Sequence, residues 1–576
     1  LRGYVDQVRD ALDIGRACKA LMFMQSNGGL TDAALFQGKD AILSGPAGGI
    51  VGMVKTGQAA GYDRLIGFDM GGTSTDVSHF AGDYERTFET EVAGVRMRAP
   101  MMDIHTVAAG GGSILSFRDG RYQVGPESAG ADPGPACYRR GGPLTVTDCN
   151  VMLGKLTPAH FPHVFGPDAN LPLDADVVRD KFMQLADEIA AATGLATEPP
   201  EHVAQGFLRI AVDNMANAIK KISVQRGHDV TGYTLQCFGG AGGQHACLVA
   251  DALGMRRVFV HPFAGVLSAY GMGLAEIRAL RERQFDAPLS ALDAACAALD
   301  QITADALAEV RSQLPSPSGG QIQTQARAHL RYDGSHQSLE VAFETIPQMQ
   351  QAFEHAHKSR FGFISPERDI LFEMLSAEAI GITGEAPRAA PLTTATPCDI
   401  DVGIFVNGTH QQAKLLDRNA LALGTILHGP AIITEATGTN IVEPGWSAQI
   451  DTFGNLIMER EHSIDRTSAA GTHVDPVLLE VFNNLFMSVA DQMGATLANT
   501  SWSVNIKERL DFSCAIFDNL GDLVANAPHV PVHLGSMSDS IKTVMHQNLG
   551  RIRAGDAYML NSPFNGGTHL PDVTVV

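Results

Sequence analysis

An apolar run, two glycines and a second segment of alternating apolar and polar residues near the start of the chain predict a β-hairpin. Residues 65–68 form an apolar run that ends at Asp69, two glycines follow, and alternation resumes at Thr75. This pattern is typical of a strand that stops, turns tightly on glycine and returns as a second strand. We therefore expect a strand–turn–strand unit over residues 65–77.

Later segments show the helical period. Residues 203–226 carry apolar side chains every three or four positions, from Phe207 to Ile222, and predict a helix. An alanine-rich helix is predicted over 286–314, and another over 477–501 with Asp475 as its N-cap and Pro476 in its first turn. Alternation predicts strands over much of 321–460 and over 509–518. This mixture of elements indicates the α/β class.

The turn at the tip of the predicted hairpin has the residue types of a phosphate site. Glycines let backbone N–H groups approach phosphate oxygens, hydroxyl groups can donate to the same oxygens, and carboxylates can hold hydrated Mg²⁺. An ordinary β-turn between two strands is the alternative. The candidate residues are the carboxylates Asp69 and Asp76, the glycines Gly71 and Gly72, and the hydroxyls Thr73 and Thr75.

A second glycine turn follows the apolar run 235–238 and leads into a predicted helix. It lacks the acidic residue and the spacing of a dinucleotide fingerprint, so a Rossmann fold is rejected. His245 at the helix start fits a capping role as well as a ligand contact. The glycines of this second nucleotide-type turn are Gly239, Gly240, Gly242 and Gly243.

Three further segments are rich in glycine. Residues 44–49 precede a helix and fit either close helix packing or an anion site. Gly111 and Gly112 belong to a third cluster and are candidate substrate contacts. Residues 125–138 are too rich in glycine and proline for a regular element and are expected to form the wall of a site. Within them, Asp132 is a candidate substrate or metal contact, with plain turn chemistry as the alternative.

The last hundred residues hold most of the metal-capable side chains. His529 and His533 lie on either side of Pro531, which makes a shared helix face improbable. His569 and Asp572 lie three residues apart on a turn constrained by glycine and proline. Such a pair, with donors from His529, His533 or the candidate catalytic carboxylate Asp511, suits a divalent metal with open positions. Surface turns with incidental histidines are the alternative.

Composition narrows the class of partner. The chain has 576 residues, 45% of them hydrophobic, and a net charge of −21, which disfavours nucleic acid and anionic membranes. Its eight cysteines form no CxxC pair, and no apolar run approaches ~20 residues. We expect a cytoplasmic protein that binds a small molecule. Leu1 is not a start methionine and residue 576 falls within a predicted strand, so a fragment truncated at both ends is expected.

The glycine turns, taken together, resemble a known family. Residues 67–77, the turn at 44–49, the loop 125–138 and the turn 238–246 occur in the order and spacing of the hydantoinase A/oxoprolinase family. Residues 505–515 and 525–537 resemble hydantoinase B. The segment 242–247 is more similar to the oxoprolinase branch. One departure is Ser562, where relatives commonly have aspartate, and an acidic role at that position is therefore doubtful.

The resemblance implies a fold and an activity. It implies that residues 1–285 are an actin/hexokinase-like ATPase domain that lacks its N-terminal half. A β-rich accessory region (286–460), a linker (461–473) and the start of an α+β hydantoinase B domain (474–576) would follow. The resemblance also implies ATP and Mg²⁺ as cofactors, a second divalent metal in the B part, and a homo-oligomeric full-length protein. The implied reaction is phosphorylation of the lactam oxygen of 5-oxo-L-proline, followed by metal-assisted hydrolysis to L-glutamate.

Two alternatives stay open. The first is another ATP-dependent enzyme of the superfamily, an N-methylhydantoinase or a ketone carboxylase; such relatives usually keep the A and B parts on separate chains. The second is a fragment that only binds nucleotide or a partner chain. An assay with 5-oxoproline, ATP and bicarbonate would separate the enzymes, and calorimetry with ATP would test the fragment.

Overall fold

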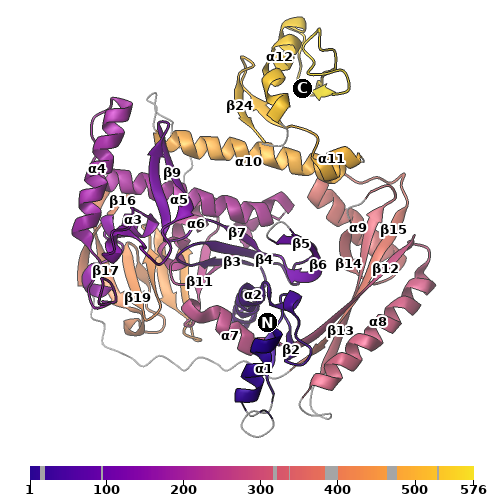
Figure 1. Cartoon of the computed structure of the whole chain (residues 1–576), viewed down its shortest axis with the longest axis horizontal. Coiled ribbons are helices and arrows are strands. Elements are labelled where there is room, and N and C mark those ends of the chain that lie inside the picture. The colour runs from indigo at the N-terminus through magenta and orange to yellow at the C-terminus, as the bar shows by residue number, and fades with distance from the viewer. Residues whose placement is uncertain are drawn as a thin grey trace. The chain divides into compact units, whose positions relative to one another are not determined.

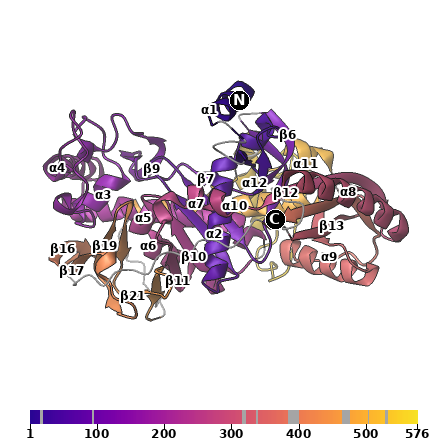
Figure 2. The same cartoon turned by 90° about the horizontal axis from the view of Figure 1, so that it is seen from below.

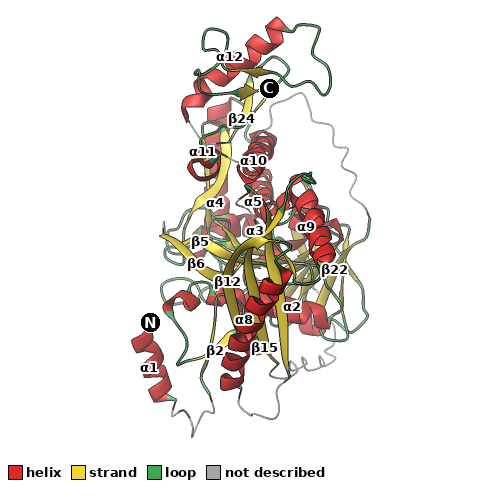
Figure 3. Cartoon of the chain, turned by 90° about the vertical axis from the view of Figure 1, so that its right-hand side faces the viewer, coloured by secondary structure: helices red, strands yellow, loops and turns green. Residues whose placement is uncertain are grey.

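In the computed structural model, the described residues are all except 13, 15–19, 93–94, 227, 315–320, 336–337, 383–399, 463–475, 502 and 528–530. The chain divides into two compact units. Unit 1 comprises Leu1–Phe285, Ala291–Ala328 and Met374–Val477, and unit 2 comprises Asp286–Ser290, His329–Glu373 and Leu478–Val576. Both units contain helices and strands (Figure 3).

An eight-stranded mixed sheet forms the centre of unit 1 (Figure 1). Its central strands β3 and β10 are almost entirely buried, as expected of parallel strands covered on both faces. Strands β10 and β11 run parallel to β3, whereas β4 is antiparallel to β3, and β7 is antiparallel to β4. The carboxyl ends of β3, β7, β10 and β11 therefore meet at one edge. In spatial order the strands are β18 (Leu427–His428), β21 (Trp446–Ile450), β22 (Leu456–Arg460), β11 (Arg257–Val260), β10 (Thr234–Phe238), β3 (Leu65–Met70), β4 (Thr75–Phe80) and β7 (His105–Val107).

Two other sheets and two hairpins contain most of the remaining strands. In the four-stranded sheet, β16, β17 and β19 lie side by side (Figure 2) around a core that includes Ile404, Ile432 and Ile441. Its order is β16 (Ile400–Val406), β17 (Thr409–Asp417), β19 (Ala431–Glu435) and β20 (Gly438–Val442). The six-stranded sheet has the order β1 (Met22–Met24), β2 (Leu30–Asp32), β12 (Ile277–Pro288), β15 (Ile370–Gly381), β13 (Ile322–Tyr332) and β14 (Leu339–Ala342). The hairpins pair β5 (Arg86–Val92) with β6 (Val95–Met102) and β8 (Ser113–Arg118) with β9 (Arg121–Ser128).

Glycines allow two helices of unit 1 to touch backbone to backbone. A Cβ added at Gly48 would lie 2.7 Å from the Ser268 carbonyl oxygen, and one added at Gly271 would lie 1.9 Å from the carbonyl oxygen of Gly48. Close helix packing is therefore the role of the small residues at 44–49. The helices concerned are α2 (Ser44–Ala59) and α7 (Leu267–Leu274); the other helices of unit 1 are α1 (Arg2–Ala11), α3 (Val146–Met152), α4 (Ala175–Thr193), α5 (Pro200–Ile222), α6 (Ala246–Leu253) and α8 (Leu292–Gln313).

Unit 2 has a small apolar core in its C-terminal part, made by Ala490, Phe512, Cys514 and Ala527. Elsewhere in this unit Tyr332 stacks edge-on against Phe353 of α9. None of the described helices combines the length and apolarity needed to cross a bilayer. The elements of this unit include α9 (Ile346–Phe361), α10 (Pro476–Thr500), α11 (Val504–Arg509), β23 (Ala515–Phe517), β24 (Leu523–Asn526), α12 (Pro531–Gln547), β25 (Met559–Leu560) and β26 (Thr574–Val575).

The predicted hairpin at 65–77 is confirmed as β3 and β4, whereas three other predictions were wrong in part. The strand predicted at 509–518 shrinks to β23, because α11 ends at Arg509 and the next residue, Leu510, is left-handed. Helix α8 begins at Leu292, since β12 continues to Pro288. Residues 125–128 belong to β9, whose last residue, Ser128, pairs with Ser113 of β8. The N-cap Asp475 and nearly all of the predicted linker lie outside the described residues.

Candidate functional site

Three glycine-rich turns meet at the edge where the parallel strands of unit 1 end. Residues 71–74 follow β3, residues 110–112 come shortly after β7, and residues 239–243 follow β10. In open α/β sheets, the carboxyl ends of parallel strands are where ligands bind. The turns predicted separately from the sequence therefore form one cluster, which we call the glycine edge.

The β3–β4 hairpin brings the two predicted carboxylates to the glycine edge. Asp69 and Asp76 are directly opposite each other in the antiparallel register. Burial, and secondarily the charge of Asp76, raises the pKa of Asp69 to about 6. Asp76 accepts a hydrogen bond of 2.7 Å from the Thr106 hydroxyl. Two carboxylates whose negative charges disfavour each other suit a cation between them.

The turn of the hairpin packs against the second glycine cluster through its backbone. Gly111 and Gly112 donate their N–H groups to the carbonyl oxygens of Gly71 and Gly72, at 3.1 and 2.6 Å. A Cβ added at Gly110 would lie 2.6 Å from the nitrogen of residue 74, so only glycine fits there. The two predicted elements therefore support each other.

The two predicted threonines differ in their surroundings. Thr75 is buried, and its hydroxyl donates to the carbonyl oxygen of Ala109, so in this structure it holds the turns together. Thr73 is exposed at the hairpin tip. Among the described residues, no acceptor is found for the backbone N–H groups of Thr73, Gly72 and Gly240. Unpaired N–H groups on exposed glycine turns are donors that phosphate oxygens can accept.

The third turn fits tightly against the end of β3. Gly239 has φ +80°, and a Cβ there would lie 2.4 Å from the Met70 carbonyl oxygen and 2.5 Å from Oδ1 of Asp69. The Ala241 N–H donates to the same Met70 carbonyl at 3.0 Å. His245, which ends this turn, is buried and lies 3.3 Å from the Asn150 amide. Burial, with the charge of Lys155, lowers the pKa of His245 to about 3, so this ring is neutral.

A wall not predicted from the sequence faces the third turn. The β19–β20 hairpin lines a small pocket together with the Gly239–Gly243 turn and Gly265. Added Cβ atoms at Gly243 and Gly265 would lie 2.3 Å from Oδ1 of Asn440 and Oγ1 of Thr437. Glu435 of the hairpin forms an ion pair with Arg418, with 2.9 Å between Oε1 and Nη1. No local motif signals this hairpin, because it reaches the turn through tertiary packing.

The predicted wall loop contacts the second glycine cluster. Ala129 donates its N–H to the Gly112 carbonyl at 2.9 Å, and a buried residue missed by the sequence analysis, Asp148, accepts the N–H groups of Ala136 and Cys137. Asp132 lies on the exposed part of this loop. The loop is thus fixed at both ends beside the glycine edge, while Asp132 stays a predicted contact.

Unit 2 brings together three of the predicted metal ligands. Oδ2 of Asp572 lies 3.2 Å from Nδ1 of His569 and 3.6 Å from Nε2 of His533, whose Nδ1 lies 3.0 Å from the Ser513 hydroxyl. His529 lies outside the described residues. In the described part of the chain, no hydrogen bond or ion pair joins the exposed Asp511 side chain to this group. Two imidazoles and a carboxylate are a donor set suited to Zn²⁺ or a similar ion.

Comparison with known proteins gives two matching family models. The model described as hydantoinase/oxoprolinase matches residues 1–281, and the one described as hydantoinase B/oxoprolinase matches residues 475–576. The first contains the whole glycine edge but not the β19–β20 hairpin. The second contains His533, His569 and Asp572.

Among curated proteins, the chain is similar to 5-oxoprolinases. It is 41% identical to 5-oxoprolinase 1 of Arabidopsis thaliana over 597 residues, which cover 100% of this chain and 46% of that protein. It is 41% identical to 5-oxoprolinase of Saccharomyces cerevisiae over 584 residues, 96% of this chain and 45% of that protein. The chain thus spans a little under half the length of these relatives.

Solved structures share the fold. The crystal structure of ATP-dependent caprolactamase from Pseudomonas jessenii aligns with a TM-score of 0.71 and 27% identity, covering 80% of this chain and 68% of that one. Nucleotide-free acetone carboxylase aligns with a TM-score of 0.59 and 22% identity over 80% of this chain and 67% of that one, which concerns the fold alone. The expected α/β fold class is confirmed.

Proposed function

The chain belongs to the hydantoinase/oxoprolinase family, and on this premise we propose that it is part of an ATP-dependent lactam hydrolase that opens 5-oxo-L-proline to L-glutamate. The observation that carries the proposal is the glycine edge, where unpaired N–H donors lie beside Asp69 and Asp76. The names of the relatives support a lactam, because 5-oxoproline and caprolactam are both cyclic amides.

The reaction needs coupling because a five-membered lactam is resonance-stabilised and barely strained. Transfer of the γ-phosphoryl group of ATP to the lactam oxygen removes that stabilisation, and water can then add to the ring carbon. The carbon–nitrogen bond breaks, a proton goes to the leaving nitrogen, and a second water releases phosphate from the resulting acyl phosphate. The sum is 5-oxo-L-proline, ATP and two waters giving L-glutamate, ADP and phosphate.

In unit 1 the residues of the glycine edge bind and orient the nucleotide. The N–H groups of Gly72, Thr73 and Gly240 donate to phosphate oxygens, as in other glycine-rich anion sites. Asp69 and Asp76 would hold Mg²⁺, which supplies neutralisation of phosphate charge. Adenosine is proposed to bind in the pocket between the Gly239–Gly243 turn and the β19–β20 hairpin. The proposed substrate contacts are Gly111, Gly112 and Asp132.

In unit 2 His533, His569 and Asp572 would hold a divalent metal, and the donor set fits such an ion. When bound, the ion supplies Lewis acidity. The 3.0 Å contact between Ser513 and Nδ1 of His533 orients that ring so that Nε2 faces Asp572. Asp511 stays a candidate for moving a proton.

An assay of the purified chain with 5-oxo-L-proline and MgATP, with and without bicarbonate, tests the proposal. We expect glutamate and ADP in equal amounts, independent of bicarbonate. A carboxylated product, or ADP release that ignores 5-oxoproline, would overturn it. Calorimetric titration with MgATP tests the glycine edge separately, and failure of ATP to bind would refute the role given to the three turns.

A further inference from the structure

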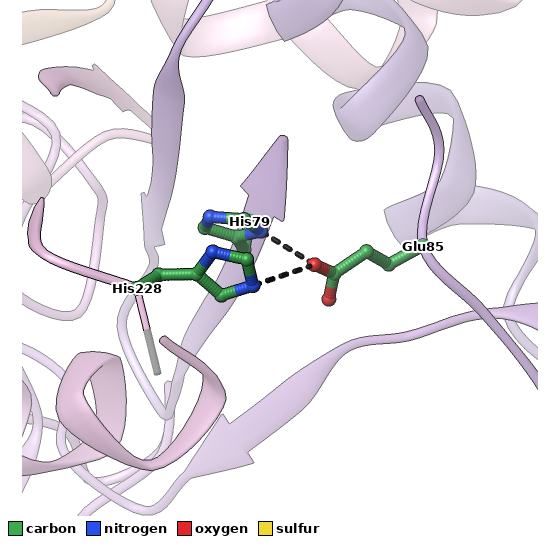
Figure 4. Close-up of side chains that lie close together, drawn as sticks. All are labelled: His79, Glu85 and His228. Carbon is green, nitrogen blue, oxygen red and sulfur yellow. Dashed lines mark hydrogen bonds and ion pairs between the residues drawn. The ribbon is translucent and has the colours of Figure 1, made fainter. Parts of the chain in front are cut away.

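A second group of metal-capable residues lies in unit 1 at the opposite end of β4 from the glycine edge. His79, Glu85 and His228 approach one another, with their potential ligand atoms all within 4.8 Å (Figure 4). In the described part of the chain no other trio of His, Cys, Asp or Glu meets that distance. His79 lies on β4, Glu85 immediately precedes β5, and His228 follows α5, so the fold rather than a motif assembles them.

The donor atoms are spaced for a small tetrahedral ion. Nδ1 of His79 lies 2.6 Å from Oε1 of Glu85, and Nε2 of His228 lies 3.8 Å from the same oxygen. Ligand atoms at about 2.0–2.1 Å from a tetrahedral Zn²⁺ are about 3.4 Å apart, a value between these two distances. The imidazole rings stack with centroids 4.2 Å apart, and both direct a nitrogen at the carboxylate (Figure 4).

Outer contacts orient His79 and Glu85 as in known metal sites. Nε2 of His79 is 3.1 Å from the Tyr233 hydroxyl, which leaves Nδ1 facing Glu85. The other oxygen of Glu85 accepts from Nη1 of Arg226 at 2.9 Å, and Arg226 also contacts the carboxylate of Asp103. The guanidinium charge is thus balanced by two carboxylates.

The group is accessible to an ion from solvent. The His79 side chain is 1% exposed, whereas those of Glu85 and His228 are 27% and 36% exposed, so one side is open to solvent.

We propose that His79, Glu85 and His228 bind a divalent transition-metal ion of the Zn²⁺ type. Two imidazoles and one carboxylate favour Zn²⁺ and Co²⁺ over Mg²⁺ and Ca²⁺, which prefer all-oxygen ligands. The ion ties β4, which begins at one turn of the glycine edge, to the segment that leads into β10, which ends at another. His79 lies four residues beyond Thr75, or about 13 Å along the strand, so this site is distinct from the nucleotide site.

Zinc binding to the chelator-stripped chain tests this site. The double variant His569→Ala/Asp572→Ala serves as background, because it removes the candidate site of unit 2. We expect one zinc per chain in this background after dialysis. His228→Ala should weaken zinc binding at least about 100-fold, and Tyr233→Phe, which removes only an orienting contact, about 10-fold.

The matched control is His428→Ala. His428 is an exposed histidine that also contacts a carboxylate, that of Glu461, but has no third ligand. It should leave zinc affinity unchanged. Co²⁺ added to the unsubstituted background should give the intense visible absorption of a tetrahedral site, a readout that needs no variant to fold. Zinc affinity unaltered by His228→Ala, or no zinc retained by the background, would overturn the proposal.

Discussion

Replacing Asp69 by asparagine should stabilise unit 1. The carboxyl of Asp69 has its pKa raised from its ordinary 3.8 to about 6, first by burial and then by Asp76. Because the folded-state pKa lies above the unfolded one, the folded chain keeps a proton between about pH 4 and pH 6 that the unfolded chain releases. Stability is therefore lost as pH rises through this window, and the amide of Asp69→Asn avoids the loss.

The magnitude follows from the two pKa values. A difference of about 2 pH units at 1.36 kcal/mol each corresponds to about 3 kcal/mol of unfolding free energy at pH 8. Partial solvation of the side chain makes this an upper value. At pH 5 the Asp69 carboxyl is ionised in the unfolded chain but mostly protonated in the folded chain. The gain in unfolding free energy from Asp69→Asn therefore falls to about half its value at pH 8.

Urea unfolding at pH 8 and pH 5 measures this difference. Trp446 is fully buried in unit 1, so its fluorescence reports that unit once Trp502 is replaced by phenylalanine. Asp168→Asn, at an exposed position, is the control and should change stability by less than about 0.5 kcal/mol. A variant no more stable than the parent at pH 8, or one whose advantage is equal at both pH values, would refute the reasoning.

The same variant tests the proposed role in nucleotide binding. If Asp69 helps hold Mg²⁺, the ratio of ATP affinities measured with and without Mg²⁺ should shrink in Asp69→Asn. A ratio equal to that of the parent chain would assign the carboxylate no part in metal binding. Greater stability combined with poorer binding is the pattern expected of a functional residue whose charge the fold tolerates.

Three further predictions concern packing and chemistry. Gly110→Ala should cost about 1–3 kcal/mol and weaken ATP binding, because its Cβ would clash with the hairpin turn, whereas Gly72→Ala, which meets no atom within 4 Å, should keep the melting temperature. His569→Ala should abolish glutamate formation while leaving ATP affinity unchanged in calorimetry, and an unchanged rate would contradict a metal at that residue. Glu443→Leu should cost about 3–5 kcal/mol because it leaves Lys155, 2% exposed, without its partner; a second substitution of that lysine by methionine should restore most of the loss in thermal unfolding.

Sequence reasoning worked where the signal was local. The β3–β4 hairpin and the strand–glycine–helix unit ending at Leu253 were predicted correctly, because strand length, turn glycines and helix period lie within about 20 residues of one another. That these turns share an edge follows from parallel strand order, which local patterns do not encode. The resemblance to a family supplied the nucleotide role that the residues alone left open.

The missed residues depend on contacts between distant segments. Glu435 and Asn440 reach the Gly239–Gly243 turn only after two sheets have formed, and His79 meets His228 only because β4 and the end of α5 lie together. The strand predicted at 509–518 failed for a related reason. Phe512 and Cys514 pack into the apolar core of unit 2 although the segment that holds them is not a strand. The alternation of apolar and polar residues there therefore reflects burial of every second side chain.

The strand order of the central sheet also constrains how the chain can fold during synthesis. Val260 of β11 pairs with Leu456 of β22, a residue made 196 positions later. At about 5–20 residues per second, the ribosome takes about 10–40 s to deliver that partner. Throughout this interval a nascent chain with all three glycine turns complete still has an unpaired β11 edge, and its Gly239 turn has no wall until the β19–β20 hairpin has been made. The proposed nucleotide site would therefore be complete only once the sheet is complete, and the exposed edge of β11 is where a chaperone would be needed.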